Sequence, residues 1–172
     1  MQCPKVKAYL GLGSNEGCSE KLLLSAIESL HKHPFISVSA SASLYKSKPV
    51  DNTRQANFLN TAVAIVTTLD PYELLKECKN LEHKNQRKHH YHWGPRTLDI
   101  DILLYGNISI RNEVLTIPHK EIKNRDFVLA PLVELAPLLT LPTGKPINAL
   151  LDTAPVNILS RQRVKNLYAC DT

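Results

Sequence analysis

Two aspartates one residue apart are the most chemically suggestive pair in this sequence of 172 residues. Asp99 and Asp101 lie in the apolar stretch 98–105, and the two-residue period of a β-strand places both carboxylates on one face, roughly 7 Å apart. A solvated sheet face would carry such a pair without any function. Arg96, three residues upstream, instead favours Mg²⁺ held by the acids together with phosphate oxygens.

The positive charge of the chain concentrates directly before this strand. Lysine and arginine outnumber the acidic residues 21 to 16, which gives a net charge of +5. The segment from Lys84 to Arg96 contains basic residues and the histidines His89, His90 and His92, but no acid. The histidine spacing fits neither a helical zinc pair nor a zinc finger, so we interpret the segment as a binding loop for a polyanion, either a nucleotide or a nucleic acid.

Aromatic and amide side chains could bind a planar molecule. Trp93 precedes a Gly-Pro turn beside the basic segment, where its ring could stack on a heterocycle, although a lone tryptophan more often fills a core. Phe58 and Asn60 share one face of the stretch 58–67 and could hold a heteroaromatic ring, although a core phenylalanine beside an asparagine explains the same pattern. Three further side chains could donate hydrogen bonds to phosphate: Thr116, His119 and Arg125.

The glycine-rich run 11–17 follows an expected strand and precedes an expected helix, as a dinucleotide-binding motif does. The G-x-G-x-x-G pattern requires a glycine at position 16, which is Glu16, and we expect no parallel βαβ unit around it. We therefore interpret these glycines as residues of a tight turn.

Hydrophobic periodicity predicts the elements that must position these residues. Ser19 is a predicted N-cap of one helix, and the run Asp70-Pro71-Tyr72-Glu73 predicts a second helix through an N-cap, a first-turn proline and a capping-box glutamate. A third helix is expected at 126–135, and the tail beyond Pro137 is weakly patterned. The predicted strands are 6–12, 38–45, 58–67 and 98–105, with short ones near Ser109 and Val114.

The order β-α-β-β-α-β predicts an α+β fold with a ferredoxin-like βαββαβ core. Such a core has an antiparallel sheet with both helices on one face, and we expect additional C-terminal helices and strands around it. The whole chain, 1–172, is expected to form a single domain. The polar loop 46–57 is longer than a hairpin needs and is therefore a candidate functional loop.

Composition excludes several classes of protein. A hydrophobic share of 43% with 22% charged residues is typical of a folded core rather than a disordered chain. The apolar runs are far shorter than the ~20 residues of a membrane span, and the N-terminus has no secretory signal, so we expect a cytoplasmic protein with no membrane partner. The four cysteines form no C-x-x-C pair and are expected to be reduced.

Together, these motifs resemble the 6-hydroxymethyl-7,8-dihydropterin pyrophosphokinases of folate biosynthesis. The resemblance implies transfer of a diphosphate from ATP to the hydroxymethyl group of the reduced pterin, which gives AMP and the pterin diphosphate. It also implies a monomer without a fused folate-pathway domain, whose partners are these two substrates and not nucleic acid. The matching runs are Tyr9-Leu10-Gly11-Leu12-Gly13-Ser14-Asn15, Phe58-Leu59-Asn60, Pro118-His119, Ala130-Pro131-Leu132 and, most specific, Trp93-Gly94-Pro95-Arg96-Thr97-Leu98-Asp99-Ile100-Asp101.

The resemblance further implies a role for each matched residue. Asp99 and Asp101 would bind two Mg²⁺ ions that bridge the ATP phosphates, and Arg87 and Arg96 would complete the catalytic group. Phe58 and Phe127 would lie on either side of the pterin ring. The residues implied around ATP are Glu82, Trp93, Arg96, Ile102, Thr116, His119 and Arg125. Those implied around the pterin are Ser47, Val50, Phe58, Asn60, Trp93 and Phe127.

The sequence departs from the family pattern at several positions. Val114 stands where an arginine is usual, Lys48 where a proline is frequent, and the run from Lys88 to His92 has histidines in place of arginines. Two other functions are compatible with parts of the pattern. An RNA-binding module would need exposed aromatic residues on adjacent strands, which show no such pattern here. A non-catalytic nucleotide-binding regulator would explain the basic segment but not the pairing of Phe58 with Asn60.

Overall fold

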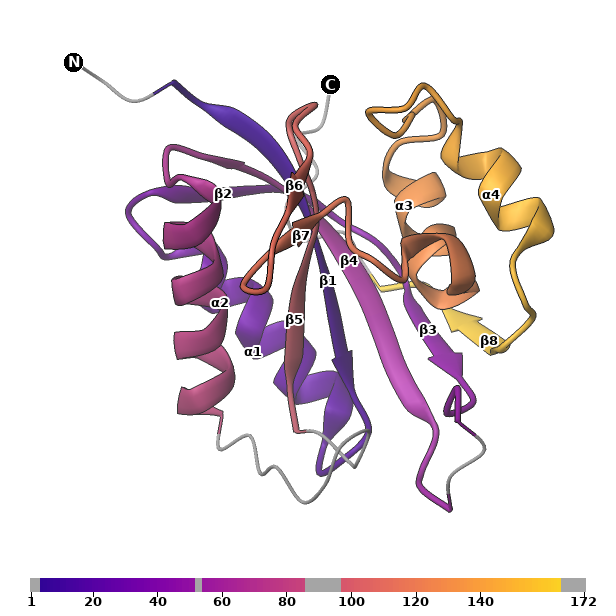
Figure 1. Cartoon of the computed structure of the whole chain (residues 1–172). Coiled ribbons are helices and arrows are strands. Elements are labelled where there is room, and N and C mark those ends of the chain that lie inside the picture. Colours follow the sequence, from indigo (N-terminus) through magenta and orange to yellow (C-terminus); the bar gives the residue numbers. More distant parts are fainter. Residues whose placement is uncertain (1–3, 52–53, 86–96, 165–172) are drawn as a thin grey trace.

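The computed structural model describes residues 4–51, 54–85 and 97–164, and its centre is a six-stranded antiparallel sheet (Figure 1). The strand order is β5-β1-β4-β3-β8, and β2 also pairs with β4. A separate hairpin is formed by β6 (Ile110–Arg111) and β7 (Thr116–Ile117). The strands of the large sheet are β1 (Val6–Ser14), β2 (Ile36–Ser41), β3 (Leu44–Ser47), β4 (Phe58–Thr67), β5 (Asp99–Tyr105) and β8 (Ile158–Gln162).

Helices cover both faces of this sheet (Figure 1). On one face, α1 (Ser19–His31) and α2 (Pro71–Lys84) bury Leu23, Leu30 and Leu74 against apolar side chains of the strands. On the other face, α3 (Asp126–Leu135) and α4 (Ile147–Thr153) bury Leu129 and Ile147, and the short 3₁₀ turn η1 (Ile122–Asn124) leads into α3. The predicted ferredoxin-like core, with its first two helices on one face, is confirmed.

Local sequence signals account well for the start of α2. Asp70 accepts hydrogen bonds from the backbone N–H groups of Tyr72 and Glu73, and the Glu73 carboxylate accepts one from the N–H of Asp70, so the predicted capping box is present. The prediction for α1 is wrong by one residue, because the N-cap position is held by Cys18 without a side-chain cap.

The predicted strand 38–45 is wrong as a single strand, because it is divided into β2 and β3 at residues 42–43. The backbone N–H and the hydroxyl of Ser43 both donate to Glu134 of α3, at 3.1 and 2.8 Å. The contact with a distant helix thus coincides with the break between β2 and β3, across which the register with β4 shifts by one residue. Alternation along the sequence contains no signal for such a contact.

The weakly patterned tail forms α4 and β8, and β8 extends the sheet by pairing with β3. Most of β8 is exposed, so its hydrophobic pattern is faint and the strand depends on its pairing with β3. Among the helices that the structure describes, not one has the length and apolar character needed to cross a membrane.

Candidate active site

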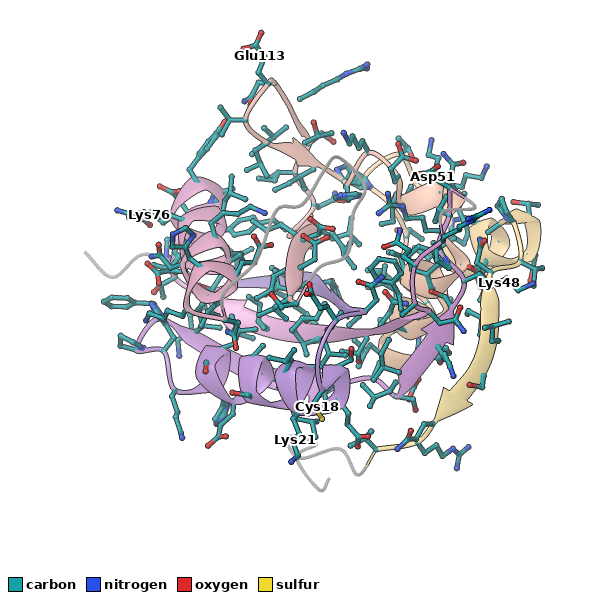
Figure 2. All side chains as sticks on the ribbon, turned by 90° about the horizontal axis from the view of Figure 1, so that it is seen from below. Cys18, Lys21, Lys48, Asp51, Lys76 and Glu113 are labelled. Atoms are coloured by element: carbon teal, nitrogen blue, oxygen red, sulfur yellow. The ribbon has the colours of Figure 1, made fainter. Side chains whose placement is uncertain are left out.

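A cavity of about 290 Å³ opens on the α3 side of the sheet. Its floor is formed by β1, β4 and β5, and its rim by the loop after β3 and the segment that leads into α3. Figure 2 shows Lys48 and Asp51 of this loop on the α3 side of the molecule, away from Cys18 and Lys21 of the α1 region. The predicted site residues that line the cavity are Val50, Phe58, Asn60, Asp99, Asp101, His119, Arg125 and Phe127.

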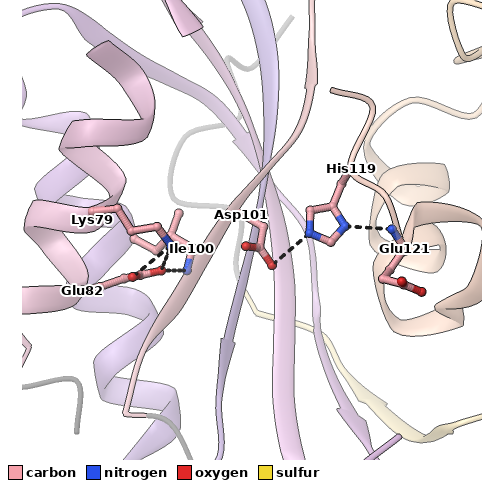
Figure 3. Close-up of polar contacts among 6 residues, drawn as sticks. All are labelled: Lys79, Glu82, Ile100, Asp101, His119 and Glu121. Atoms are coloured by element: carbon pink, nitrogen blue, oxygen red, sulfur yellow. Dashed lines mark hydrogen bonds and ion pairs between the residues drawn. The ribbon is translucent and has the colours of Figure 1, made fainter. Parts of the chain in front are cut away.

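The β5 strand directs its two aspartates into the cavity. Ile100 and Ile102 alternate with them and are 0% and 3% exposed in the core under α1 and α2, so Asp99 and Asp101 face the opposite side. Asp101 Oδ2 lies 3.7 Å from Nε2 of His119 (Figure 3). No group of three or more His, Cys, Asp or Glu side chains able to hold a metal occurs among the described residues. A metal at this pair would therefore need further oxygen ligands from a substrate.

His119 is held as a neutral imidazole beside Asp101. Burial, reinforced by the positive charge of Arg125, lowers the pKa of His119 from 6.5 to about 4. Its Nδ1 accepts a hydrogen bond from the backbone N–H of Glu121 at 3.2 Å, so the single ring proton belongs on Nε2, the atom nearest Asp101 (Figure 3). The ring can thus donate a hydrogen bond into the cavity without adding a full charge.

Two glycines give the cavity a bare backbone floor. Gly11 and Gly13 lie within β1 and pair with Asp101 and Asp99 of β5, so their interpretation as turn residues is wrong. Only Gly17 of this run has the positive φ, 74°, that a turn requires. A Cβ added at Gly13 would lie 3.0 Å from Oδ1 of Asn60, which is too close for an ordinary contact. The missing side chain therefore keeps space open beside Asn60.

Asn60 is fixed on the next strand by its amide nitrogen. Its Nδ2 donates to the buried hydroxyl of Ser47 at 2.9 Å and to the carbonyl of Tyr45 at 3.4 Å. With both N–H groups used in this way, Oδ1 is the atom turned towards Gly13 and the cavity. Ser47 does not line the cavity itself, but it orients a side chain that does.

The aromatic walls come from two distant elements. Phe58 begins β4, and Phe127 lies in the first turn of α3. The guanidinium of Arg125 lies 5.9 Å from the centre of the Phe127 ring, so a cation is held beside an aromatic face. The cavity therefore combines ring surfaces and the amide acceptor of Asn60 with a separate region of acids and cations.

The structure does not bring every predicted residue to the cavity. Glu82 is buried on the other side of β5, where it accepts the backbone N–H of Ile100 at 2.8 Å and pairs with Lys79 (Figure 3). The Ile102 side chain belongs to the core under the helices, so only its main chain could face a ligand. Thr116 is half-buried in β7 and does not line the cavity. Arg87, Trp93, Arg96 and the run from Lys88 to His92 lie outside the described residues.

Some lining residues escaped the sequence reasoning. Lys120 follows His119 directly and adds a cation, and Gln55 comes from the long loop whose length was the only available signal. Asn15, just after β1, donates to Oε1 of Gln55 at 2.9 Å and to the carbonyl of Ala56 at 3.0 Å. These contacts join two loops that are 40 residues apart in the sequence.

Comparison with known proteins gives the same family over most of the chain. Residues 9–137 match the family model described as 7,8-dihydro-6-hydroxymethylpterin-pyrophosphokinase. This chain belongs to that family. The region after residue 137, with α4 and β8, lies outside the match.

Several curated relatives carry the corresponding name. The 2-amino-4-hydroxy-6-hydroxymethyldihydropteridine pyrophosphokinase of Haemophilus influenzae is 40% identical over 146 residues, which cover 85% of this chain and 91% of that protein. The Bacillus subtilis enzyme of the same name is 44% identical over 74% of this chain and 77% of its own length. The Bifunctional protein FolKE of Lactococcus lactis is 46% identical over 74% of this chain, which spans only 36% of that longer protein.

Solved structures of the family are similar in fold. The Plasmodium falciparum HPPK-DHPS wild type with pteroate superposes with a TM-score of 0.69 at 16% identity, covering 87% of this chain and 42% of that chain. A further HPPK-DHPS structure, in complex with substrates, gives a TM-score of 0.68 at the same identity and covers 87% of this chain and 43% of that chain. This chain thus spans less than half of those proteins, and the likeness concerns the fold.

Proposed function

We propose that this protein is an enzyme that transfers a diphosphate from ATP to the hydroxymethyl group of 6-hydroxymethyl-7,8-dihydropterin, giving AMP and the pterin diphosphate. The observation that carries the proposal is one cavity in which the pair Asp99 and Asp101 lies beside Asn60 and the rings of Phe58 and Phe127. A phosphate-binding region and a planar-ligand region thus share one space. The names of the relatives support this reaction.

The acids of the cavity fit magnesium bound together with a nucleotide. Asp99 and Asp101 would hold Mg²⁺, because carboxylate oxygens are ligands this ion prefers and phosphate oxygens and water can complete its octahedron. When bound, the metal supplies neutralisation of phosphate charge. We propose two ions, with ATP as the co-substrate, because two carboxylates on one strand face can each serve one ion.

The pterin half of the site orients the attacking alcohol. Phe58 and Phe127 offer ring surfaces on which the bicyclic substrate can stack, and the Oδ1 of Asn60 accepts a hydrogen bond from a donor on its edge. Val50 from the loop after β3 adds apolar contact at the rim. A substrate held at its ring and its edge loses most of its rotational freedom, which aligns the hydroxymethyl oxygen with the phosphorus it attacks.

The cations of the cavity stabilise the transferred group and the departing AMP. Arg125 and Lys120 carry positive charge at the rim, and neutral His119 donates a hydrogen bond from Nε2. In the same proposal, Arg87, Trp93 and Arg96 contact ATP. These three residues lie outside the part of the chain that the structure describes. Glu82 contributes by accepting the Ile100 N–H and so holding β5 in place, while the main chain of Ile102 and the Thr116 hydroxyl stay predicted contacts of ATP.

The RNA-binding alternative finds no support in the structure. A sheet that binds RNA exposes one of its faces to the bases. Here Tyr9, Ala62 and Leu103 on the face opposite α1 and α2 pack against α3 and α4. We further propose that the chain 1–172 acts as one domain, since β8 from its C-terminal part belongs to the same sheet as β1. A monomer in the cytoplasm is part of the same proposal.

The test is AMP release from ATP in the presence of Mg²⁺ and the hydroxymethyl dihydropterin. We expect the parent protein to release AMP, and the Asp101→Ala variant to lose at least about a hundredfold in kcat/KM while keeping its circular dichroism spectrum, because a metal ligand is removed. Asp152→Ala, which removes an exposed carboxylate on α4, is the matched control and should keep the parent rate. Near-normal turnover in Asp101→Ala would contradict the metal assignment.

A further inference from the structure

A buried carboxylate lies directly before the aromatic wall of the cavity. Asp126 begins α3 and is only 5% exposed. Its Oδ2 accepts hydrogen bonds from the backbone N–H groups of Asn157 and Ile158, at 2.7 and 2.8 Å, and its Oδ1 accepts the N–H of Phe127 at 2.8 Å. One side chain therefore joins the start of α3 to the start of β8. Hydrogen bonds to a charged acceptor are among the stronger ones in proteins.

The segment that Asp126 holds also contacts the opposite wall of the cavity. The carbonyl of Asn157 accepts the backbone N–H of Lys48 at 3.0 Å, and Ile158 is the register partner of Ser47 in the β3–β8 pair. Ser47 in turn accepts the amide of Asn60. Three consecutive contacts therefore run from Asp126, beside Phe127, through Ile158 and Ser47 to Asn60.

We infer that Asp126 is a positioning residue for the pterin half of the site, which it holds by fastening the 157–158 segment between Phe127 and Ser47. This inference rests on the proposed function, because it assigns the two walls to one substrate. The segment lies beyond residue 137, where the family match ends, so a part of the chain outside that match sets the width of the cavity.

A second acid on the same helix provides a matched control. Glu134 accepts hydrogen bonds from Ser43 at 2.8 Å and from the hydroxyl of Tyr45 at 2.7 Å, and it pairs with Arg161 of β8 at 3.1 Å. Burial alone would raise the pKa of Glu134, but the hydrogen bonds from Tyr45 and Ser43 hold it below its usual value. Glu134 thus also fastens β3 and β8 to α3, but it does not line the cavity.

The experiment compares Asp126→Asn with Glu134→Gln, each of which replaces one carboxylate oxygen by an amide nitrogen. In Asp126→Asn at least one backbone N–H then faces another donor, so the segment loosens. We expect the Kd of the pterin, measured by calorimetry in the presence of a non-hydrolysable MgATP analogue, to rise about tenfold. The Kd of that analogue alone should change less than twofold. Glu134→Gln should lower the melting temperature and change the pterin Kd less than twofold, because Glu134 contacts the ring hydroxyl of Tyr45 and not the backbone carbonyl that accepts the Asn60 amide.

Hydrogen exchange tests the contact between Asp126 and the 157–158 segment directly, without any substrate. Amides of residues 157–162 and 47–51 should exchange faster in Asp126→Asn than in Glu134→Gln. Equal pterin Kd values in Asp126→Asn and the parent, or equal increases in both variants, would overturn the inference. If Asp126→Asn does not fold, Asn157→Pro removes one donor and leaves the carboxylate in place, and the same outcomes apply. If the parent binds pterin but releases no AMP, the proposed reaction fails while this inference stands.

Discussion

Adding a single methyl group at Gly13 should weaken pterin binding through Asn60. The Cβ of an alanine at this position would lie 3.0 Å from Asn60 Oδ1, so the amide must give way by a few tenths of an ångström. The amide is held by a 2.9 Å hydrogen bond to Ser47, which such a shift strains or breaks. One hydrogen bond contributes about 1 to 1.5 kcal/mol, and about 1.4 kcal/mol corresponds to a tenfold change in affinity. We therefore expect the pterin KM of Gly13→Ala to rise roughly five- to tenfold.

The assay is steady-state AMP release with the pterin varied at saturating MgATP. The KM for MgATP should stay within about twofold of the parent, because the methyl group acts on Asn60 and not on the aspartates. Gly144→Ala is the control: it makes the same chemical change at a left-handed position, φ 83°, with no atoms within 4 Å of the new Cβ, and so strains the backbone without touching the cavity. An unchanged pterin KM in Gly13→Ala, or an equal rise in Gly144→Ala, would refute the reasoning.

Two further predictions concern stability. The pKa of His119 lies near 4 in the folded protein and 6.5 when unperturbed, so the unfolded chain takes up the proton first, and the free energy of unfolding should fall by up to about 3 kcal/mol as the pH drops from 6.5 to 4. Measured by urea unfolding across this pH range, the free energy of unfolding should depend less steeply on pH in His119→Gln than in the parent. Identical pH dependences in the two proteins would contradict the lowered pKa of His119. Asp70→Ala removes the N-cap of α2 and should lower the free energy of unfolding by about 1 kcal/mol, while the pterin KM stays at the parent value. An unchanged melting temperature would show that the cap does not stabilise the protein.

The framework of the fold could be predicted because its signals are local. The Asp70 capping box, the β-branched run of β4 and the alternation along β5 each lie within about ten residues, and each marks an element that the structure contains. The facing of Asp99 and Asp101 followed from the period of two alone.

The elements that escaped prediction depend on contacts distant in sequence. The break before β3 coincides with the contact between Ser43 and Glu134, 91 residues apart, and β8 is held in the sheet by its pairing with β3. Gly11 and Gly13 resemble turn residues in the sequence because the need for a bare floor appears only when Asn60 and Asp101 lie beside them. Burial of Glu82 on the helix side of β5 was likewise invisible without the packing of α2, whereas the period of two already placed Ile102 on the face opposite the aspartates.

The most direct test of the central claim is the identity of the two products. The parent protein, incubated with Mg²⁺, ATP and 6-hydroxymethyl-7,8-dihydropterin, should yield AMP and a pterin heavier by a whole diphosphate, in equal amounts by chromatography and mass spectrometry. Formation of ADP with a pterin monophosphate, or no modified pterin at all, would contradict the account.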